Sequence, residues 1–237
     1  MVTSLRPKRL FLKGLLDFAF PPLCLGCKEY HNEPSDICAH CMSKIETYDR
    51  PLCLNCLDVI PGPKGCPICR ELSIPLFAYG NYRSPLREIL LEFKFHGITS
   101  PAATFAGLLH KQFEREMNAL SAELVIPIPL YPSRARQRGY NQAALFAESL
   151  ASLLGLPVSE EILYRTQKRK PQSKVAFERR AVNVRGVFDV PEETPDRLRV
   201  LLVDDVVTSG ATAAEAKRQL EQAGYRVCAM AAIAHGL

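Results

Sequence analysis

Apolar and polar residues alternate in blocks after residue 74, and this pattern predicts strands that take turns with helices. The run Arg199 to Val203 is too apolar for a strand with one wet face, so we expect it to be buried on both faces. The alternation predicts an α/β domain over residues 74–237, in which helices flank a parallel sheet. Strands are expected at 76–82, 124–128, 162–164, 199–203 and 227–234, and helices at 85–94, 102–117, 141–154 and 213–223.

The first 73 residues have a different character, because eight of the nine cysteines lie there in four C-x-x-C pairs. A two-residue spacer lets both sulfurs reach one ion, and two such pairs make a tetrahedral thiolate cage. We therefore predict two structural zinc ions in an N-terminal module over residues 1–73, with no open coordination position. The expected ligands are Cys24, Cys27, Cys38, Cys41, Cys53, Cys56, Cys66 and Cys69.

Three alternatives concern these cysteines and their neighbours. A disulfide framework is disfavoured, because no export signal is evident and the compartment should be reducing. The spacing leaves open whether the pairs combine in sequence or interleave. His31 and His40 are possible replacement ligands, but we expect them in solvated loops, and Cys228 in the core.

The N-terminal segment contains basic residues followed by the apolar run 10–12, but Lys13 and Asp17 interrupt that run. We do not expect an export signal there. An amphipathic helix that lies on a lipid surface and one that packs against its own protein both remain open. No stretch approaches the roughly 18 uninterrupted apolar residues of a membrane span.

The formal net charge of +5 is concentrated in one segment, residues 165–185. Eight basic residues and one acidic residue, Glu178, give this segment a local charge of +7. Such a cluster suits a diphosphate or a nucleic-acid backbone, although a solvated charge run is the alternative. Its basic residues are Arg165, Lys168, Arg169, Lys170, Lys174, Arg179, Arg180 and Arg185.

Candidate chemistry follows the strand 199–203. Asp204 and Asp205 offer two carboxylates at its end, which can accept hydrogen bonds from the hydroxyls of a vicinal diol. The next residues are small or carry hydroxyls and lead into a helix, whose first N–H groups favour a phosphate. These residues are Thr208, Ser209, Gly210, Ala211 and Thr212, where glycine permits close approach of the phosphate. Together they predict a ribose 5-phosphate site; the alternative is a helix cap beside solvated aspartates.

A second loop, 129–142, follows the strand 124–128. Arg134, Arg136 and Arg138 can donate charge-assisted hydrogen bonds to a diphosphate, and Gly139 permits the turn into the next helix. Lys94 stands at the end of an earlier helix and could reach the same group. The alternative is that exposed arginines only solubilise the loop.

The thirteen residues 200–212 resemble the signature of type I phosphoribosyltransferases, which bind 5-phosphoribosyl 1-diphosphate. The whole chain, over roughly residues 15 to 235, resembles the ComF family, which joins a double zinc ribbon to a phosphoribosyltransferase-like domain. The resemblance rests on the cysteine pairs and on the motifs at Lys94-Phe95-His96-Gly97, Pro127-Ile128-Pro129-Leu130, Arg138-Gly139-Tyr140-Asn141-Gln142, Gln172-Ser173 and Arg179 to Phe188.

This resemblance implies a type I phosphoribosyltransferase-like sheet and binding of phosphoribosyl diphosphate with Mg²⁺. Asp204 and Asp205 would contact the ribose hydroxyls as the catalytic pair, and residues 208–212 the 5-phosphate. Lys94, Arg134 and Arg138 would bind the diphosphate. The flexible loop that closes over the ligand would contain Lys168, Arg169, Lys170, Arg179 and Arg185. The charge of +7 leads to the hypothesis that this loop also contacts DNA, with the zinc ribbon as the alternative surface.

For the whole protein, the resemblance implies a cytoplasmic factor in DNA uptake during natural transformation, with a peripheral position at the inner membrane left open. Single-stranded DNA, a competence helicase and DNA-processing proteins are the implied partners. No feature selects an acceptor, so enzymatic transfer is an open question. Two alternatives are a non-enzymatic DNA-binding factor that uses the pocket as a sensor, and a salvage enzyme for purines or pyrimidines.

Overall fold

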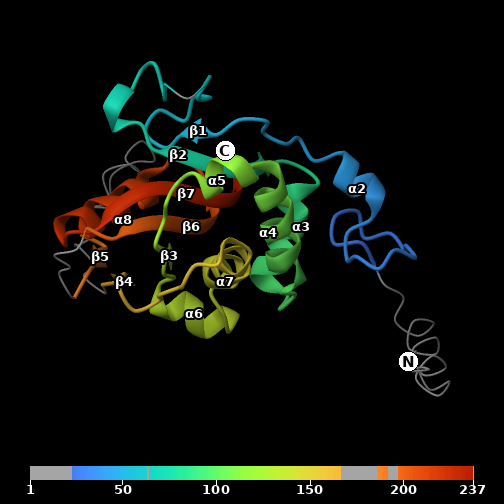
Figure 1. Ribbon diagram of the computed structural model, residues 1–237. Helices are drawn as coiled ribbons and strands as arrows, with labels where there is room; N and C mark the ends of the chain where they lie inside the picture. Colours follow the sequence, from blue (N-terminus) through green and yellow to red (C-terminus); the bar gives the residue numbers. More distant parts are fainter. Residues whose placement is uncertain (1–22, 63, 167–185, 192–196, 237) are drawn as a thin grey trace, which may run out of the picture.

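The structure is a computed structural model that describes residues 23–62, 64–166, 186–191 and 197–236 (Figure 1). Its elements confirm the predicted alternation of strands and helices after residue 74. In chain order they are α2 (Ala39–Ser43), β1 (Leu52–Cys53), the 3-10 helix η1 (Arg70–Leu72), β2 (Pro75–Asn81), α3 (Leu86–Phe95), α4 (Ser100–Gln112), α5 (Glu114–Asn118), β3 (Leu124–Pro127), α6 (Pro132–Arg138), α7 (Gln142–Leu154), β4 (Tyr164–Arg165), β5 (Phe188–Asp189), β6 (Arg199–Val207), α8 (Ala211–Gln222) and β7 (Arg226–His235).

Five strands form the main sheet in the order β1-β2-β7-β6-β3. Strands β2, β7, β6 and β3 run parallel, while β1 pairs antiparallel with β2. The carboxyl ends of the four parallel strands therefore meet at one edge of the sheet, where ligands bind in open α/β folds. The predicted fold class, a parallel sheet flanked by helices behind a cysteine-rich module, is confirmed.

Strand β6 is buried on both faces, as its sequence predicts. Leu201 and Val203 belong to a core that contains residues of α3, α4 and α7, whereas Val200 and Leu202 belong to a second core with residues of α8. All four side chains are fully buried. The three helices thus cover one face of the sheet and α8 the other (Figure 1).

Most boundaries differ from the sequence predictions by one or two residues, and the strand expected at 162–164 is the two-residue strand β4 (Tyr164–Arg165). Three further differences have a structural cause. Strand β6 continues past Val203 to Val207, because the following residues remain paired with β7 up to His235. The predicted helix 102–117 is interrupted at Phe113, which leaves the helical conformation and packs its ring 5.3 Å from that of Phe77. Part of the predicted loop 129–142 is the helix α6, as described below.

The cysteine module is joined to the sheet at both ends of β2. We call residues 23–45 ribbon 1 and residues 52–73 ribbon 2; Figure 1 shows them on separate parts of the molecule. The segment between the ribbons lies along the end of β2: Tyr48 donates its N–H to the Tyr79 carbonyl (3.1 Å), and Glu46 accepts from the Asn81 N–H (2.8 Å). Ribbon 2 supplies β1. Main-chain hydrogen bonds therefore cross the domain boundary expected near residue 73, which stays a prediction.

Among the described residues, no helix is long and apolar enough to cross a membrane. The amphipathic segment considered at the N-terminus lies outside the described residues.

Candidate functional site

Asp204 and Asp205 lie near the carboxyl end of β6, and the alternation of a strand sends their side chains to opposite faces. Lys94, in the last turn of α3, forms an ion pair with Asp205 (Nζ to Oδ2, 3.0 Å), and both side chains are largely buried. Asp204 Oδ1 accepts a hydrogen bond from the Asp205 N–H (2.8 Å). The two carboxylates therefore occupy different electrostatic environments.

Burial raises the pKa of Asp204 to about 7, and the negative charge of Asp205 acts in the same direction. The Asp205 N–H, Lys94 and Arg165 oppose this rise, because each favours the ionised carboxylate. Asp204 therefore changes its protonation near neutral pH, at a point where a ligand hydroxyl could donate to it. Titration in that range makes its environment a candidate functional site.

The end of β6 and the loop after it line a small hollow that opens to solvent. Gly210 precedes α8 as its N-cap with φ 71°, a left-handed conformation that glycine adopts without strain. The first N–H groups of this 12-residue helix and its dipole favour an anion there. The structure thus brings the predicted phosphate residues together with Asp204, whereas Asp205 does not line the hollow. Its lining is Asp204, Val206, Val207, Thr208, Ser209, Gly210, Ala211, Thr212, Ala213 and Met230.

The predicted diphosphate loop contains a seven-residue helix, α6, which corrects the expectation of an irregular loop. Proline at the first helical position, Pro132, favours a helix start, and Gly139 ends the helix with φ 81°. Arg134 and Arg136 are exposed. Arg138 is anchored: it donates to Gln142 Oε1 (3.0 Å).

Arg138 also lies against an aromatic ring, with its guanidinium carbon 4.9 Å from the ring centre of Phe95 at the end of α3. Gln142 in turn donates to the Phe93 carbonyl (3.3 Å). These contacts hold Arg138 against Phe95, at the carboxyl end of α3. Lys94 itself is paired with Asp205, so its diphosphate role stays a prediction.

Arg165 is a residue that the sequence analysis counted in the basic run but did not assign to the site. Its guanidinium carbon lies 4.2 Å from the ring centre of Tyr131 and 4.9 Å from that of Phe188, its pairing partner across β4 and β5. Burial lowers the pKa of Arg165, which nearby Asp204 opposes. Its Nε is buried and has no hydrogen-bond acceptor among the described residues. No sequence motif distinguishes this arginine from its neighbours.

Glu215 in α8 is a second residue that sequence reasoning missed. Its buried carboxylate accepts from the Gly186 N–H (2.6 Å) and from two nitrogens of Arg218 (2.7 and 2.9 Å). Hydrogen bonds from Arg218 are the largest cause that lowers the pKa of Glu215 to about 2. Glu215 thereby fixes Gly186, the first described residue after 167–185, against α8.

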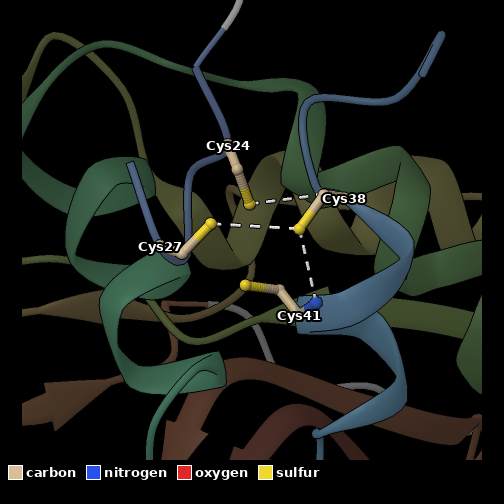
Figure 2. A group of neighbouring side chains, drawn as sticks. All are labelled: Cys24, Cys27, Cys38 and Cys41. Carbon is tan, nitrogen blue, oxygen red and sulfur yellow. Dashed lines mark hydrogen bonds between the residues drawn. The ribbon is translucent and has the colours of Figure 1, made fainter. Parts of the chain in front are cut away.

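The cysteines form two clusters, and the pairs combine in sequence, which settles the pairing that the spacing left open. Within each cluster the four sulfurs lie within 4.8 Å of one another. Tetrahedral zinc with bonds of about 2.3 Å would hold its sulfurs roughly 3.8 Å apart. Cluster 1 contains Cys24, Cys27, Cys38 and Cys41, whose sulfurs point toward one centre (Figure 2), and cluster 2 contains Cys53, Cys56, Cys66 and Cys69.

These donor sets fit two structural zinc sites. In cluster 1, the N–H groups of Gly26 and Cys38 donate to the Cys24 sulfur, each at 3.3 Å, and such bonds favour a thiolate. His40 is exposed, as expected, and neither it nor His31 belongs to a cluster. The expectation of a solvated loop is wrong for His31, because both ring nitrogens are shielded from solvent.

Cys228 is partly buried on β7, and its sulfur donates to the Val200 carbonyl (3.2 Å). It packs against the core, which agrees broadly with its expected place. The loop residues Lys168, Arg169, Lys170, Arg179 and Arg185 lie outside the described residues.

Comparison with known proteins gives both sequence and structural relatives. Residues 15–71 match the model of the double zinc ribbon domain. Competence protein F of Haemophilus influenzae is 32% identical over 219 residues, which cover 90% of each chain. Competence protein ComFC of Streptococcus pneumoniae is 27% identical and covers 82% of this chain and 86% of its own.

The DNA utilization protein YhgH of Escherichia coli is also 27% identical, over 91% of this chain and 94% of its own. Among solved structures, an adenine phosphoribosyltransferase from Thermoanaerobacter pseudethanolicus aligns with a TM-score of 0.31 and 17% identity, over 58% of this chain and 85% of that chain. The relationship to competence protein F extends along nearly the whole of both sequences, including the cysteine module. The chain therefore belongs to the ComF family.

Proposed function

We propose that this protein binds 5-phosphoribosyl 1-diphosphate, as its magnesium complex, at the carboxyl edge of the sheet. We call residues 208–212 the phosphate loop. The observation that carries the proposal is the hollow in which this loop and Asp204 meet at the start of α8. A 5-phosphate fits the helix N-terminus, and a ribose hydroxyl fits the neighbouring carboxylate. A simple anion site would not require a carboxylate in its wall.

Two arginines that are held in place by their neighbours are suited to the diphosphate end of this ligand. Arg138 is held in place by Gln142 and Phe95, and Arg165 is held between two rings with one nitrogen lacking an acceptor among the described residues. Lys94 neutralises Asp205, so an additional carboxylate does not repel the ligand. Mg²⁺ commonly binds through one or two carboxylates together with substrate phosphates, and it would enter here with the diphosphate.

For the biological role, we propose that the protein takes part in DNA uptake or DNA utilization in the cytoplasm. The names of its relatives support this role, because they refer to competence and to DNA utilization. The charge of +7 over residues 165–185 suits single-stranded DNA. A competence helicase and DNA-processing proteins are the partners that such a role would require.

The ligand proposal is tested by calorimetric titration of the zinc-loaded protein with phosphoribosyl diphosphate and Mg²⁺. We expect binding by the wild type and loss of binding in the double variant Asp204→Asn with Asp205→Asn. Asp49→Asn, a substitution of an exposed aspartate between the ribbons, is the matched control and should leave affinity unchanged. A wild type that does not bind would refute the proposal.

Titration at several pH values adds a second test. An ionised carboxylate accepts a hydrogen bond from a ribose hydroxyl more strongly than the protonated acid does, so affinity should rise as the pH increases through about 7, the pKa of Asp204. Asp204→Asn should remove this pH dependence. A wild-type affinity that stays constant between pH 6 and pH 8 would argue against a ribose contact at Asp204.

DNA binding is tested separately with charge reversal at Lys168, Arg169 and Lys170. This variant should bind single-stranded DNA more weakly, and its affinity should depend less on salt, because fewer counterions are released. The Asp204 and Asp205 variant should retain DNA binding if the two ligands use different surfaces. Unchanged DNA affinity in the charge-reversed variant would reject the contact.

A further inference from the structure

The first cysteine pair of ribbon 2 lies directly behind the phosphate loop. A Cβ atom placed on Gly210 would be 3.1 Å from the carbonyl oxygen of Leu54 and 3.9 Å from Cδ2 of Leu57. Leu57 also packs against the core cluster that contains Val207 and Ala213, which flank the loop on either side. A segment distant in sequence therefore limits where the loop can move.

The position of this segment depends on the metal cluster. Leu54 lies between the ligands Cys53 and Cys56, and Leu57 follows them immediately. The turn is closed by hydrogen bonds from the Leu57 N–H to the Cys53 carbonyl (2.7 Å) and from the Cys53 N–H to the Asp58 carbonyl (2.7 Å). A zinc ion would fix the two cysteines on either side of Leu54. Small zinc modules have too little core to fold without their metal, so the position of this turn would depend on zinc.

The sheet supplies the second support for this segment. The Leu54 N–H donates to the Ile74 carbonyl (2.8 Å), just before β2, and the Leu54 side chain is buried. The Leu54 carbonyl is thus held between cluster 2 and the sheet, and it faces Gly210. Neither ribbon contributes a residue to the wall of the hollow; ribbon 2 lies against Gly210, whereas ribbon 1 packs around α3.

We propose that Leu57 and the Leu54 carbonyl are positioning groups for the phosphate loop, so that zinc at cluster 2 and ligand in the hollow stabilise each other. This inference rests on the proposed function and adds a regulatory link to the same site. Loss of zinc from cluster 2 releases the support behind Gly210, and the loop N–H groups then no longer converge on a phosphate. By linkage, a bound ligand must retain that zinc by the same factor.

The positioning role is tested with Leu57→Ala, which removes the contact side chain but no metal ligand. We expect phosphoribosyl diphosphate to bind about tenfold more weakly, within the usual range of coupling between sites. Leu57→Met should restore most of the affinity. Leu72→Ala is the matched control, because Leu72 is a leucine of the same ribbon whose side chain is 74% exposed. All three variants should retain two zinc ions per chain.

The reciprocal effect is tested by equilibrium competition for zinc with a coloured chelator, because linkage relates the two affinities. Cys27→Ser retains cluster 2 alone, and Cys56→Ser retains cluster 1 alone. Phosphoribosyl diphosphate should strengthen zinc binding by the first variant about tenfold and should not change zinc binding by the second. This readout follows the metal itself and does not require turnover.

The outcomes separate the two proposals. No binding of phosphoribosyl diphosphate by the wild type would overturn the proposed function and this inference together. Binding by the wild type with equal affinity in Leu57→Ala, or equal strengthening of zinc binding at both clusters, would overturn the inference and leave the proposed function intact. Weaker binding in Leu57→Ala together with stronger zinc binding confined to cluster 2 would support it.

Discussion

Ribbon 1 packs its cysteine cluster against helices, whereas ribbon 2 joins the β-sheet and the phosphate loop. Cys24 and Cys41 belong to the core that contains residues of α3, α4 and α7. Lys28 extends this contact by an ion pair with Glu92 of α3 (2.5 Å). Cys53 belongs instead to a small hydrophobic core of its own, with Ile60 and Cys66. Ribbon 2 attaches through β1 and through Leu54 and its neighbours.

The difference arises from residues that do not bind metal. Both ribbons begin with the sequence Cys-Leu-x-Cys, and x is Gly26 in ribbon 1 and Asn55 in ribbon 2. A Cβ on Gly26 would lie 2.9 Å from the Cys41 sulfur and 3.3 Å from Cβ of Pro85, so only glycine lets ribbon 1 approach α3 this closely. Asn55 is exposed. The ligand spacing predicts the metal, and the intervening residues determine what each metal site supports.

The largest effect is expected from the removal of one ligand from each cluster. Cys41→Ser and Cys69→Ser should each lower the zinc content from two ions to one, with loss of up to about 10–16 kcal/mol of apparent zinc binding energy. Cys41→Ser should lower the melting temperature of the whole chain more, because Cys41 lies in the main core. Zinc analysis and calorimetry measure both effects. Equal decreases in melting temperature would contradict the claim that ribbon 1 is more closely tied to the main core than ribbon 2.

The two leucines that follow the first ligands provide a matched pair. Leu25 and Leu54 are 6% and 3% exposed, so replacement of either by alanine should cost about 2–5 kcal/mol in the free energy of unfolding. Leu54→Ala alone should also weaken ligand binding, because loss of the buried side chain lets the Leu54 carbonyl shift from its place against Gly210. Denaturant unfolding and titration calorimetry distinguish these effects. A comparable loss of affinity in Leu25→Ala would contradict the division of roles.

Exchange of the third residue of each motif sharpens the comparison. Gly26→Asn should cost about 1–3 kcal/mol, because the added side chain collides with the Cys41 sulfur and with Pro85. Asn55→Gly should cost about 1 kcal/mol, because it loses the hydrogen bond from Nδ2 to the Leu72 carbonyl (2.6 Å) and creates no clash. Thermal unfolding of both variants measures the two costs in the free energy of unfolding. Similar costs would show that the two motifs pack alike.

The smallest effect is expected at the surface of ribbon 1. Lys28 is half exposed, so Lys28→Ala should cost less than about 1 kcal/mol of the free energy of unfolding, and the cost should shrink at high salt. Lys44→Ala, at an exposed lysine of the same ribbon, is the control. A larger cost that does not depend on salt would mean that the helix contact relies on this ion pair.

Local and periodic features could be predicted from the sequence. The metal sites follow from the C-x-x-C spacing, and the burial of β6 follows from its unbroken apolar run. The position of the loop after β6 at a helix start follows from the small and hydroxyl residues that precede a helical pattern there. These signals act within a few residues, so they do not depend on the tertiary structure.

Contacts between distant segments could not be predicted in the same way. The stacking of Arg165 on Tyr131 and Phe188 joins three separate elements, and the Glu215 contact with Gly186 spans 29 residues. The sequence predicts Lys94 near a diphosphate, but the pairing of Lys94 with Asp205 depends on where α3 ends beside β6. Such roles depend on packing, which a hydrophobic pattern does not encode.

The two attachments along β2 also have a consequence for solubility. Without β1 and the segment at Glu46 and Tyr48, β2 would be an outermost strand with unpaired main-chain groups and the apolar residues Leu76 to Tyr79. An uncovered strand of this kind is a template on which other chains can pair and aggregate. The cysteine module therefore shields the sheet from intermolecular strand addition, and that protection depends on the metal supply of the cell.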